Sequence, residues 1–381
     1  MASNHAVAGS QSSRERNPFR FALKNLNASK PRPTKSGLVS RRASDITPRN
    51  VEWLWPGRIP LGKVTMMAGD PGLGKSQLSS DICARLTIAG SWPNGEGKAP
   101  LGNVIILSAE DDDEDTIVPR LMAAEADLTR VHIVRAVCDE NGKGQHTFNL
   151  QKDISRLEAL IEEVSDVRLI VIDPISSYLG TKLDSHNNTQ VRGALEPLIE
   201  MAGRLGIAIV AITHSPKGTG IKAIHSFVGS IAFVGAARSG YIVTKDPDDE
   251  EARLLLPVKQ NVAPGDAKGL AFRIEGCTVT GQDGEAIQTS RIVWGGYTET
   301  KADDALSALG NDEASEQDRA VAFLKSALNS GPAPMKEIEA WAEGEGIAQR
   351  TLRRAKRHLN VQSVKLGLQD GWAWQLSHKE H

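Results

Sequence analysis

Residues 69–76 have the order and composition of a loop that binds phosphate groups. They match the pattern G-x-x-x-x-G-K-[ST] and consist of Gly69, Asp70, Pro71, Gly72, Leu73, Gly74, Lys75 and Ser76. The glycines let backbone N–H groups converge on phosphate oxygens at the start of a helix, whose dipole also favours anions. We therefore expect this loop, with Gln77 behind it, to hold ATP. Lys75 would neutralise the β- and γ-phosphates and the Ser76 hydroxyl would bind Mg²⁺; the alternative is a simple glycine-rich turn.

Asp173 ends the apolar run 169–172, which has the character of a strand buried on both faces. This position places a carboxylate at the C-terminal edge of the predicted sheet, where α/β folds bind their ligands. We expect Asp173 to hold Mg²⁺ through water, as the Walker B acid does. The alternative is an aspartate that stabilises a turn or caps a helix.

Hydrolysis also needs a group that orients or deprotonates the attacking water. In many P-loop ATPases this group is a glutamate directly after the Walker B acid, but here that residue is Pro174. Glu110 is the predicted replacement, because it follows the apolar run 104–108, which comes after the phosphate-loop helix and should end near the phosphates. A solvated acidic loop is the alternative, since residues 111–115 are all acidic.

Short apolar runs alternate with helical stretches between residue 51 and about residue 300, which is typical of a mostly parallel sheet covered by helices. The expected strands are 63–68, 103–108, 131–134, 168–172 and 207–213. The expected helices are 76–89, 116–126, 151–164 and 189–204. After residue 240 the pattern predicts an antiparallel pair, 241–245 and 253–259, that continues the sheet edge. The predicted fold class is therefore α/β.

The composition is that of an ordinary soluble globular protein. Of 381 residues, 40% are hydrophobic and 24% are charged, and the formal net charge is -2. The three cysteines, Cys83, Cys138 and Cys277, are far apart, which argues against a disulfide scaffold or a zinc site and fits a reducing cytoplasm. No apolar run approaches the roughly 18 residues that span a bilayer, so no membrane partner is expected.

A small unit is predicted at residues 318–377. Three helices, 318–328, 335–345 and 348–359, are followed by strands 361–366 and 372–376. This is the order of elements in a winged helix-turn-helix domain. The third helix has a basic face suited to DNA phosphates, formed by Arg350, Arg353, Arg354 and Arg357. The alternative is a protein-docking domain whose basic helix meets an acidic partner.

Two further segments differ in charge from the rest of the chain. Residues 1–50 contain ten lysines and arginines against two acids, amid many Ser, Asn and Pro, and such a segment cannot bury enough apolar surface to fold alone. A solvated tail, a non-specific nucleic-acid arm and an organellar transit peptide are the open interpretations. Residues 301–317 are rich in acids and are predicted to be an acidic linker.

The glutamate after the second strand, the Walker B acid without an adjacent glutamate, and the strand end Ala211-Ile212-Thr213-His214 resemble RecA-like ATPases. Within them the chain is most similar, over residues 51–275, to the RepA and DnaB-like hexameric helicases and their phage and plasmid relatives. The resemblance implies a RecA-like ATPase domain at 51–300 that assembles as a homo-hexamer or another ring. It also implies a DNA-dependent ATPase, either a helicase or a replication-initiation motor of a phage, plasmid or mobile element. The alternatives are a non-unwinding ATP switch in repair or regulation and an adaptor that hydrolyses little ATP.

The same resemblance implies three further roles. His214 would sense the γ-phosphate from the tip of its strand. Arg238 would be an arginine finger given to the ATP of the neighbouring subunit, and Lys259 would accompany it as a second basic residue. A structural histidine and exposed surface charges are the alternatives.

The loop 215–227 is polar, basic and rich in glycine. In RecA-like motors a loop at this place contacts single-stranded DNA, so the resemblance implies that Lys217 and Lys222 grip its phosphates. An ordinary mobile surface loop is the alternative. Duplex DNA would be bound by the C-terminal unit, which resembles tail domains attached to RepA-like ATPases of phages and mobile elements.

Overall fold

The computed structural model describes residues 40, 42–139, 144–180, 183, 187–214, 223, 231–263, 267–329, 331–365 and 371–376. The chain forms two units, Met1–Asn50 and Val51–His381, and the first contributes a short 3₁₀ turn, Ala43–Asp45 (η2). Most of the basic segment 1–50 lies outside the described residues, as do Lys217 and Lys222 of the predicted DNA loop. The interpretations of these segments therefore stay predictions.

A nine-stranded sheet forms the centre of the second unit, in the order β13-β12-β11-β10-β3-β9-β8-β4-β5. Its parallel strands are β3 (Val64–Gly69), β4 (Asn103–Ser108), β5 (Val131–Val134), β8 (Val167–Asp173), β9 (Ala208–His214) and β10 (Ser239–Lys245). The remaining three, β11 (Arg253–Gln260), β12 (Gly269–Thr280) and β13 (Ala286–Thr298), continue the sheet beyond β10, each antiparallel to the strand before it. The α/β prediction is confirmed, and β4 and β5 have the predicted bounds.

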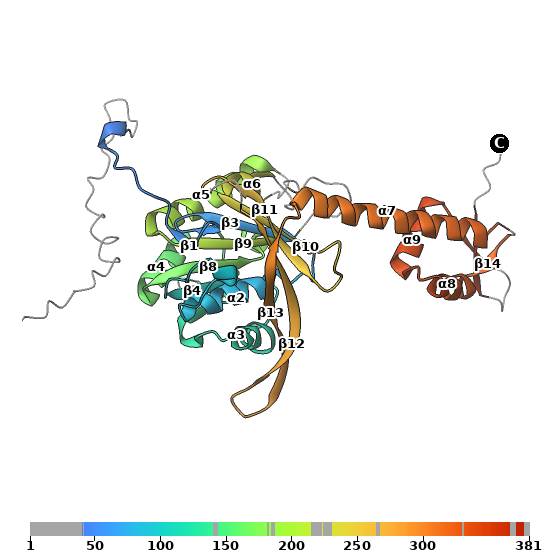
Figure 1. The fold of residues 1–381 in the computed structure, drawn as a ribbon, viewed down its shortest axis with the longest axis horizontal. Helices are drawn as coiled ribbons and strands as arrows, with labels where there is room; N and C mark the ends of the chain where they lie inside the picture. The colour runs from blue at the N-terminus through green and yellow to red at the C-terminus, as the bar shows by residue number, and fades with distance from the viewer. Residues whose placement is uncertain are drawn as a thin grey trace, which may run out of the picture. The chain divides into compact units, whose positions relative to one another are not determined.

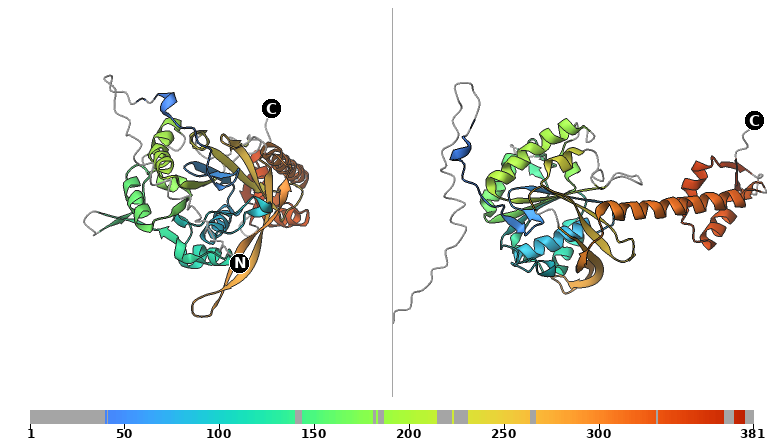
Figure 2. Two further views of the ribbon diagram at one scale, coloured as in Figure 1. Left: turned by 60° about the vertical axis from the view of Figure 1, so that its left-hand side comes forward. Right: turned by 45° about the horizontal axis from the view of Figure 1, so that its top comes forward.

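Helices cover both faces of this sheet (Figures 1 and 2). On one face lie α2 (Lys75–Thr87) and α3 (Val118–Ala123), and on the other lie α4 (Ile154–Val164), α5 (Asn188–Leu205) and α6 (Ile231–Ala236). The stripe Leu78, Ile82 and Leu86 shows why α2 packs here, since residues four apart share one helix face and all three are at most 1% exposed. Each face of the sheet therefore has its own apolar core.

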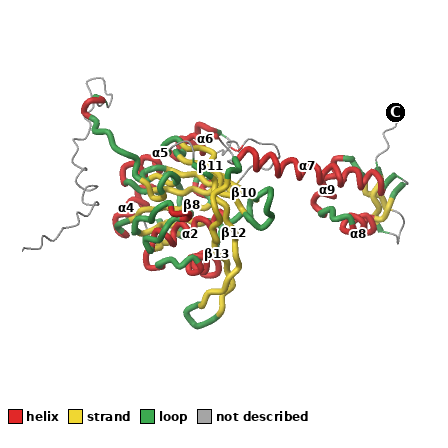
Figure 3. Tube along the Cα trace, viewed as in Figure 1, coloured by secondary structure: helices red, strands yellow, loops and turns green. Residues whose placement is uncertain are grey.

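A long hairpin of β12 and β13 extends beyond the helices, as Figures 1 and 3 show. Its base packs on α2, where the Trp294 indole Nε1 donates to Asp81 Oδ2 at 2.9 Å. The sequence pattern did not predict this hairpin, because its outer half contains no buried residue and so lacks the apolar run of a core strand.

The segment expected as an acidic linker is helical. Helix α7 (Ala302–Ala327) is continuous through residues 301–317 into the first predicted helix of the unit. Acids at its start, Asp303 and Asp304, suit the positive end of the helix dipole, and Ala305 is buried with β10 and β11 residues. The apolar contacts that stabilise this first turn are tertiary, so the acidity of the segment did not indicate a helix.

Two helices, α8 (Met335–Gly344) and α9 (Gln349–His358), pack with the end of α7 around a small core. A three-stranded antiparallel sheet in the order β14-β16-β15 accompanies them, with β14 at Ala333–Pro334, β15 at Gln362–Lys365 and β16 at Trp372–Gln375. The strands β15 and β16 were predicted, whereas the two-residue β14 was not.

Candidate functional site

The phosphate loop connects the end of β3 to the start of α2, as the sequence predicts. Gly74 adopts a left-handed backbone with φ of 85°, and a Cβ built on it would lie 2.5 Å from Ile274 Cδ1 of β12. Only glycine accepts this combination of backbone and close approach. The tight turn aims the first N–H groups of α2 into the loop, where they would meet phosphate oxygens.

Lys75 is folded back into the loop and is only 5% exposed. Its ammonium donates to the carbonyls of Gly69 at 2.9 Å and Asp70 at 2.8 Å. Burial lowers the pKa of Lys75, while the carboxylates of Asp173, Asp70 and Glu110 act to raise it. The lysine is therefore held at the loop in acidic surroundings.

Asp173 and Ser76 meet as predicted for a Mg²⁺ site. The Ser76 hydroxyl donates to Asp173 Oδ2 at 2.6 Å. Burial raises the pKa of Asp173, and the hydrogen bond from Ser76 opposes that rise. A hydroxyl and a carboxylate are hard oxygen ligands that fit Mg²⁺, which takes few protein ligands and completes its shell with phosphates and water. Accordingly, no cluster of three or more His, Cys, Asp or Glu suited to a metal occurs in the described part of the chain.

Strand order brings the other predicted residues to the same edge of the sheet. In the parallel registers Gly69 lies beside His214, and Ser108 lies beside Asp173. Glu110 follows β4 there, and its Oε1 is 3.5 Å from His214 Nε2. The carboxyl ends of β3, β9, β8 and β4 thus place the phosphate loop, the histidine and both acids together.

Glu110 differs from the acids that follow it. Asp111 pairs with Arg120 at 2.6 Å, and Asp113 pairs with Arg135 at 2.8 Å. Asp112 also contacts Arg135, at 3.4 Å. Glu110 instead faces His214 with its side chain 58% exposed. Glu110 therefore differs from these three acids in its partner, a histidine at the sheet edge in place of an arginine.

Gln77 is turned away from the phosphate loop. Its side-chain amide donates to the carbonyl of Ser290 at 2.5 Å, and its Oε1 accepts from the Ser290 hydroxyl at 3.3 Å. This side chain therefore joins α2 to β13, so the predicted contact of Gln77 with ATP gains no support from its placement.

Arg238 and Lys259 lie away from the phosphate loop of their own chain. The Arg238 N–H donates to the Val64 carbonyl at 3.0 Å, which puts it beside the first residue of β3. The loop begins at Gly69, five residues and about 16 Å farther along the strand. Lys259 pairs with Gly240, one residue into β10. Neither predicted finger residue belongs to the site built from Lys75 and Asp173.

A comparison with protein families supplies the decisive match. A family model described as an AAA domain matches residues 29–220, just over half of the chain. The chain belongs to this AAA domain family. No curated protein matches the chain. The matched range includes the phosphate loop, Glu110, Asp173 and His214, and ends before Arg238.

The family and the fold agree on the chemistry. An AAA domain with a mostly parallel central sheet is an ATP-hydrolysing P-loop enzyme with a RecA-like core. P-loop ATPases generally use ATP with Mg²⁺. None of the described helices combines the length and apolar character needed to cross a bilayer.

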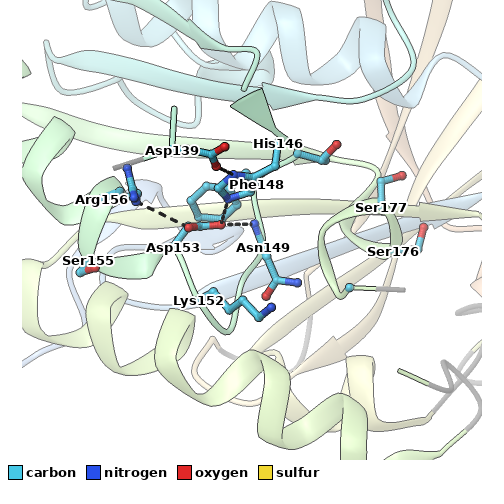
Figure 4. Close-up of a pocket in the computed structure, with 12 residues that line it drawn as sticks. Asp139, His146, Phe148, Asn149, Lys152, Asp153, Ser155, Arg156, Ser176 and Ser177 are labelled. Atoms are coloured by element: carbon cyan, nitrogen blue, oxygen red, sulfur yellow. Dashed lines mark hydrogen bonds and ion pairs between the residues drawn. The ribbon is translucent and has the colours of Figure 1, made fainter. Parts of the chain in front are cut away.

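A hollow of about 880 Å³ lies within the AAA domain at the start of α4, apart from the phosphate loop (Figure 4). His146 stands between two acids there, 3.0 Å from Asp139 and 3.3 Å from Asp153. Asp153 also accepts from the Asn149 N–H at 2.9 Å and lies near Arg156. These contacts hold the turn before α4, so the hollow has a structural explanation.

The basic helix predicted for DNA lies beyond the AAA domain match, in α9. Arg353 and Arg357 line a shallow hollow of about 960 Å³ with Lys356. The Lys356 ammonium lies 4.4 Å from the centre of the Trp374 ring, so the sheet supports this face of the helix. Arg350 is also exposed, whereas Arg354 is half-buried. The predicted basic residues therefore do not all share one environment.

Proposed function

We propose that the protein is a ring-forming, DNA-dependent ATPase, a helicase or replication-initiation motor of a phage, plasmid or mobile element. The observation that carries the proposal is the separation of Arg238 and Lys259 from Lys75 within one chain. An arginine about 16 Å along the strand from its own loop serves hydrolysis only if a second copy presents a nucleotide to it. Repeating that contact around a closed assembly forms a ring.

The residues of one chain divide the work of hydrolysis in this proposal. Lys75 and the N–H groups of the loop bind the phosphates, and Ser76 with Asp173 would hold Mg²⁺, which neutralises charge on the transferred phosphate. Glu110 orients the attacking water and accepts its proton. His214, in contact with Glu110, reports the loss of the terminal phosphate to β9. Its position at a strand end next to the loop 215–227 supports a link to DNA.

We further propose that α9 binds duplex DNA as the recognition helix of a winged helix-turn-helix unit. Three helices with a small antiparallel sheet support this assignment. The exposed guanidinium groups of Arg353 and Arg357 on one face support contact with phosphates. Single-stranded DNA would be held in the ring by Lys217 and Lys222.

The double variant Arg353→Gln/Arg357→Gln is expected to bind duplex DNA more weakly than wild type. Each lost phosphate contact should reduce the slope of log affinity against log salt by about 0.9. The measurement is a duplex titration of the full-length protein at several salt concentrations. Lys336→Gln, an exposed lysine on α8, is the matched control and should keep the wild-type slope. An unchanged slope in the double variant would favour protein docking by α9.

A strand-displacement assay on forked DNA, run beside ATP turnover with and without single-stranded DNA, tests the proposed motor. The expected result is ATP-dependent displacement together with DNA-stimulated turnover. Stimulated turnover without displacement would favour the non-unwinding switch. Turnover that ignores DNA would overturn the DNA-dependent ATPase.

A further inference from the structure

Three basic side chains from separate elements gather around α6. The Lys259 ammonium donates to the carbonyls of Val234 at 2.6 Å and Gly235 at 3.3 Å. A Cβ built on Gly235 would lie 2.8 Å from Nη2 of Arg192 in α5. The Arg192 guanidinium therefore lies against the same glycine whose carbonyl accepts from Lys259. Arg238 follows three residues later and is fixed through its backbone.

These three cations repel one another, and no described acid forms an ion pair with any of them. Burial lowers the pKa of Lys259, and the positive charges of Arg238 and Arg192 lower it further, so both guanidinium groups are close to the ammonium. Both arginine residues are exposed. Neither arginine side chain forms a hydrogen bond or ion pair with any other described residue. Such a group is a preformed site for a multiply charged anion.

The nucleotide site has the opposite imbalance of charge, because acidic side chains outnumber unpaired basic ones there. Lys75 is surrounded there by Asp70, Glu110 and Asp173. The nearby arginines, Arg120 and Arg135, are already paired with acids of the same loop. A bound triphosphate adds negative charge, and Mg²⁺ neutralises only part of it. Among the described residues, Lys75 is the only cation of the same chain at this site that is not paired with an acid.

Arg192 cannot supply them to its own nucleotide. Helix α5 packs on one face of the sheet, whereas α2 and its phosphate loop belong to the other face. The basic residues around α6 have the positive charge and the hydrogen-bond donors that the nucleotide site of a second copy lacks. We infer that Arg192 is a third basic residue, beside Arg238 and Lys259, that contacts the terminal phosphates of ATP bound to a neighbouring copy. This inference rests on the proposed ring.

Arg192→Gln, which removes the charge and keeps most of the bulk, is expected to lower kcat about tenfold to a hundredfold, the usual worth of one hydrogen bond to a charged group. ATP affinity should remain near wild type, since Lys75 and the loop are unchanged. Arg204→Gln removes an arginine from the other end of α5, where it pairs with Glu158, and is the matched control with wild-type kcat.

Gly235→Ala separates this role from a structural one. The added methyl displaces the Arg192 guanidinium, yet alanine suits a helix better than glycine. We expect lower kcat together with an unfolding midpoint equal to or above that of wild type. Lower kcat accompanied by a lower unfolding midpoint would indicate that the substitution damages α6. It would overturn the interpretation that Gly235→Ala acts through Arg192.

Mixing Arg192→Gln with Lys75→Ala assigns the contact to the neighbouring copy. Turnover above the weighted sum of the two variants is expected, and no gain would overturn action in trans.

Wild-type kcat in Arg192→Gln while Arg238→Ala is impaired would overturn the role of Arg192 and leave the ring standing. Wild-type kcat in both would overturn the ring as well. Weaker DNA binding by Arg192→Gln with unchanged DNA-free turnover would instead assign the cations to nucleic-acid phosphates.

Discussion

Replacing Arg238 with alanine is expected to lower ATP turnover by about 10³-fold to 10⁵-fold, the usual worth of an arginine finger, with ATP affinity near wild type. The reason is positional. Arg238 is held beside Val64 at the start of β3, far from the loop that follows Gly69. In the proposed ring it would therefore stabilise charge on a neighbouring ATP and would not contribute to binding by its own loop. Steady-state turnover and a nucleotide titration measure the two effects separately.

Arg238→Lys is the informative companion variant. Lysine keeps the charge but lacks the planar fork of donors, so turnover should recover only in part. Wild-type turnover should also fall on dilution below the assembly concentration. Full turnover in Arg238→Ala that is independent of protein concentration would remove the main support for a shared site.

Replacing Glu110 with glutamine is expected to preserve ATP binding and to lower turnover by about 10²-fold to 10⁴-fold, the usual contribution of a general base. Glutamine keeps the size of the side chain and a polar contact with His214, but it does not accept a proton from water. Lys75→Ala should instead abolish nucleotide binding, because Lys75 is the cation of the loop. Binding and turnover measured on both variants separate these roles.

Asp112→Asn is the matched control for Glu110, since Asp112 is in the same loop and pairs with Arg135. Its turnover should stay within a few-fold of wild type. Normal turnover in Glu110→Gln would remove Glu110 as the base. Variants of Asp111 and Asp113 would then identify the acid that serves the water.

The sequence was most informative where structure depends on neighbours in the chain. The loop 69–76 and the strand 103–108 were predicted correctly, because a glycine pattern and a continuous apolar run are local signals. Asp173 and Glu110 could be placed near the phosphates because the carboxyl ends of parallel strands share one edge of the sheet. The contact between Glu110 and His214 follows from strand order, which the sequence suggested only through resemblance.

Features that depend on distant contacts were not predictable in this way. Arg192 was missed because its signal is the approach of α5 to Gly235, which no spacing in the chain reveals. The contact of Gln77 with Ser290 could not be predicted, because the two residues are more than two hundred positions apart in the chain. The acids of the segment 301–317 predicted a linker but not its helical form, because burial of Ala305 against β10 and β11 residues stabilises the start of the helix.

We propose that two copies build one hydrolytic site. This proposal is tested most directly by mixing Arg238→Ala with Lys75→Ala at varied ratios and constant total concentration, with subunit exchange verified by a fluorescent label. In a mixed assembly an intact loop of one variant faces an intact Arg238 of the other. Turnover should therefore rise to a maximum at intermediate ratios, although each variant alone is nearly inactive. Turnover equal to the weighted sum of the two variants at every ratio, despite exchange, would contradict the shared site.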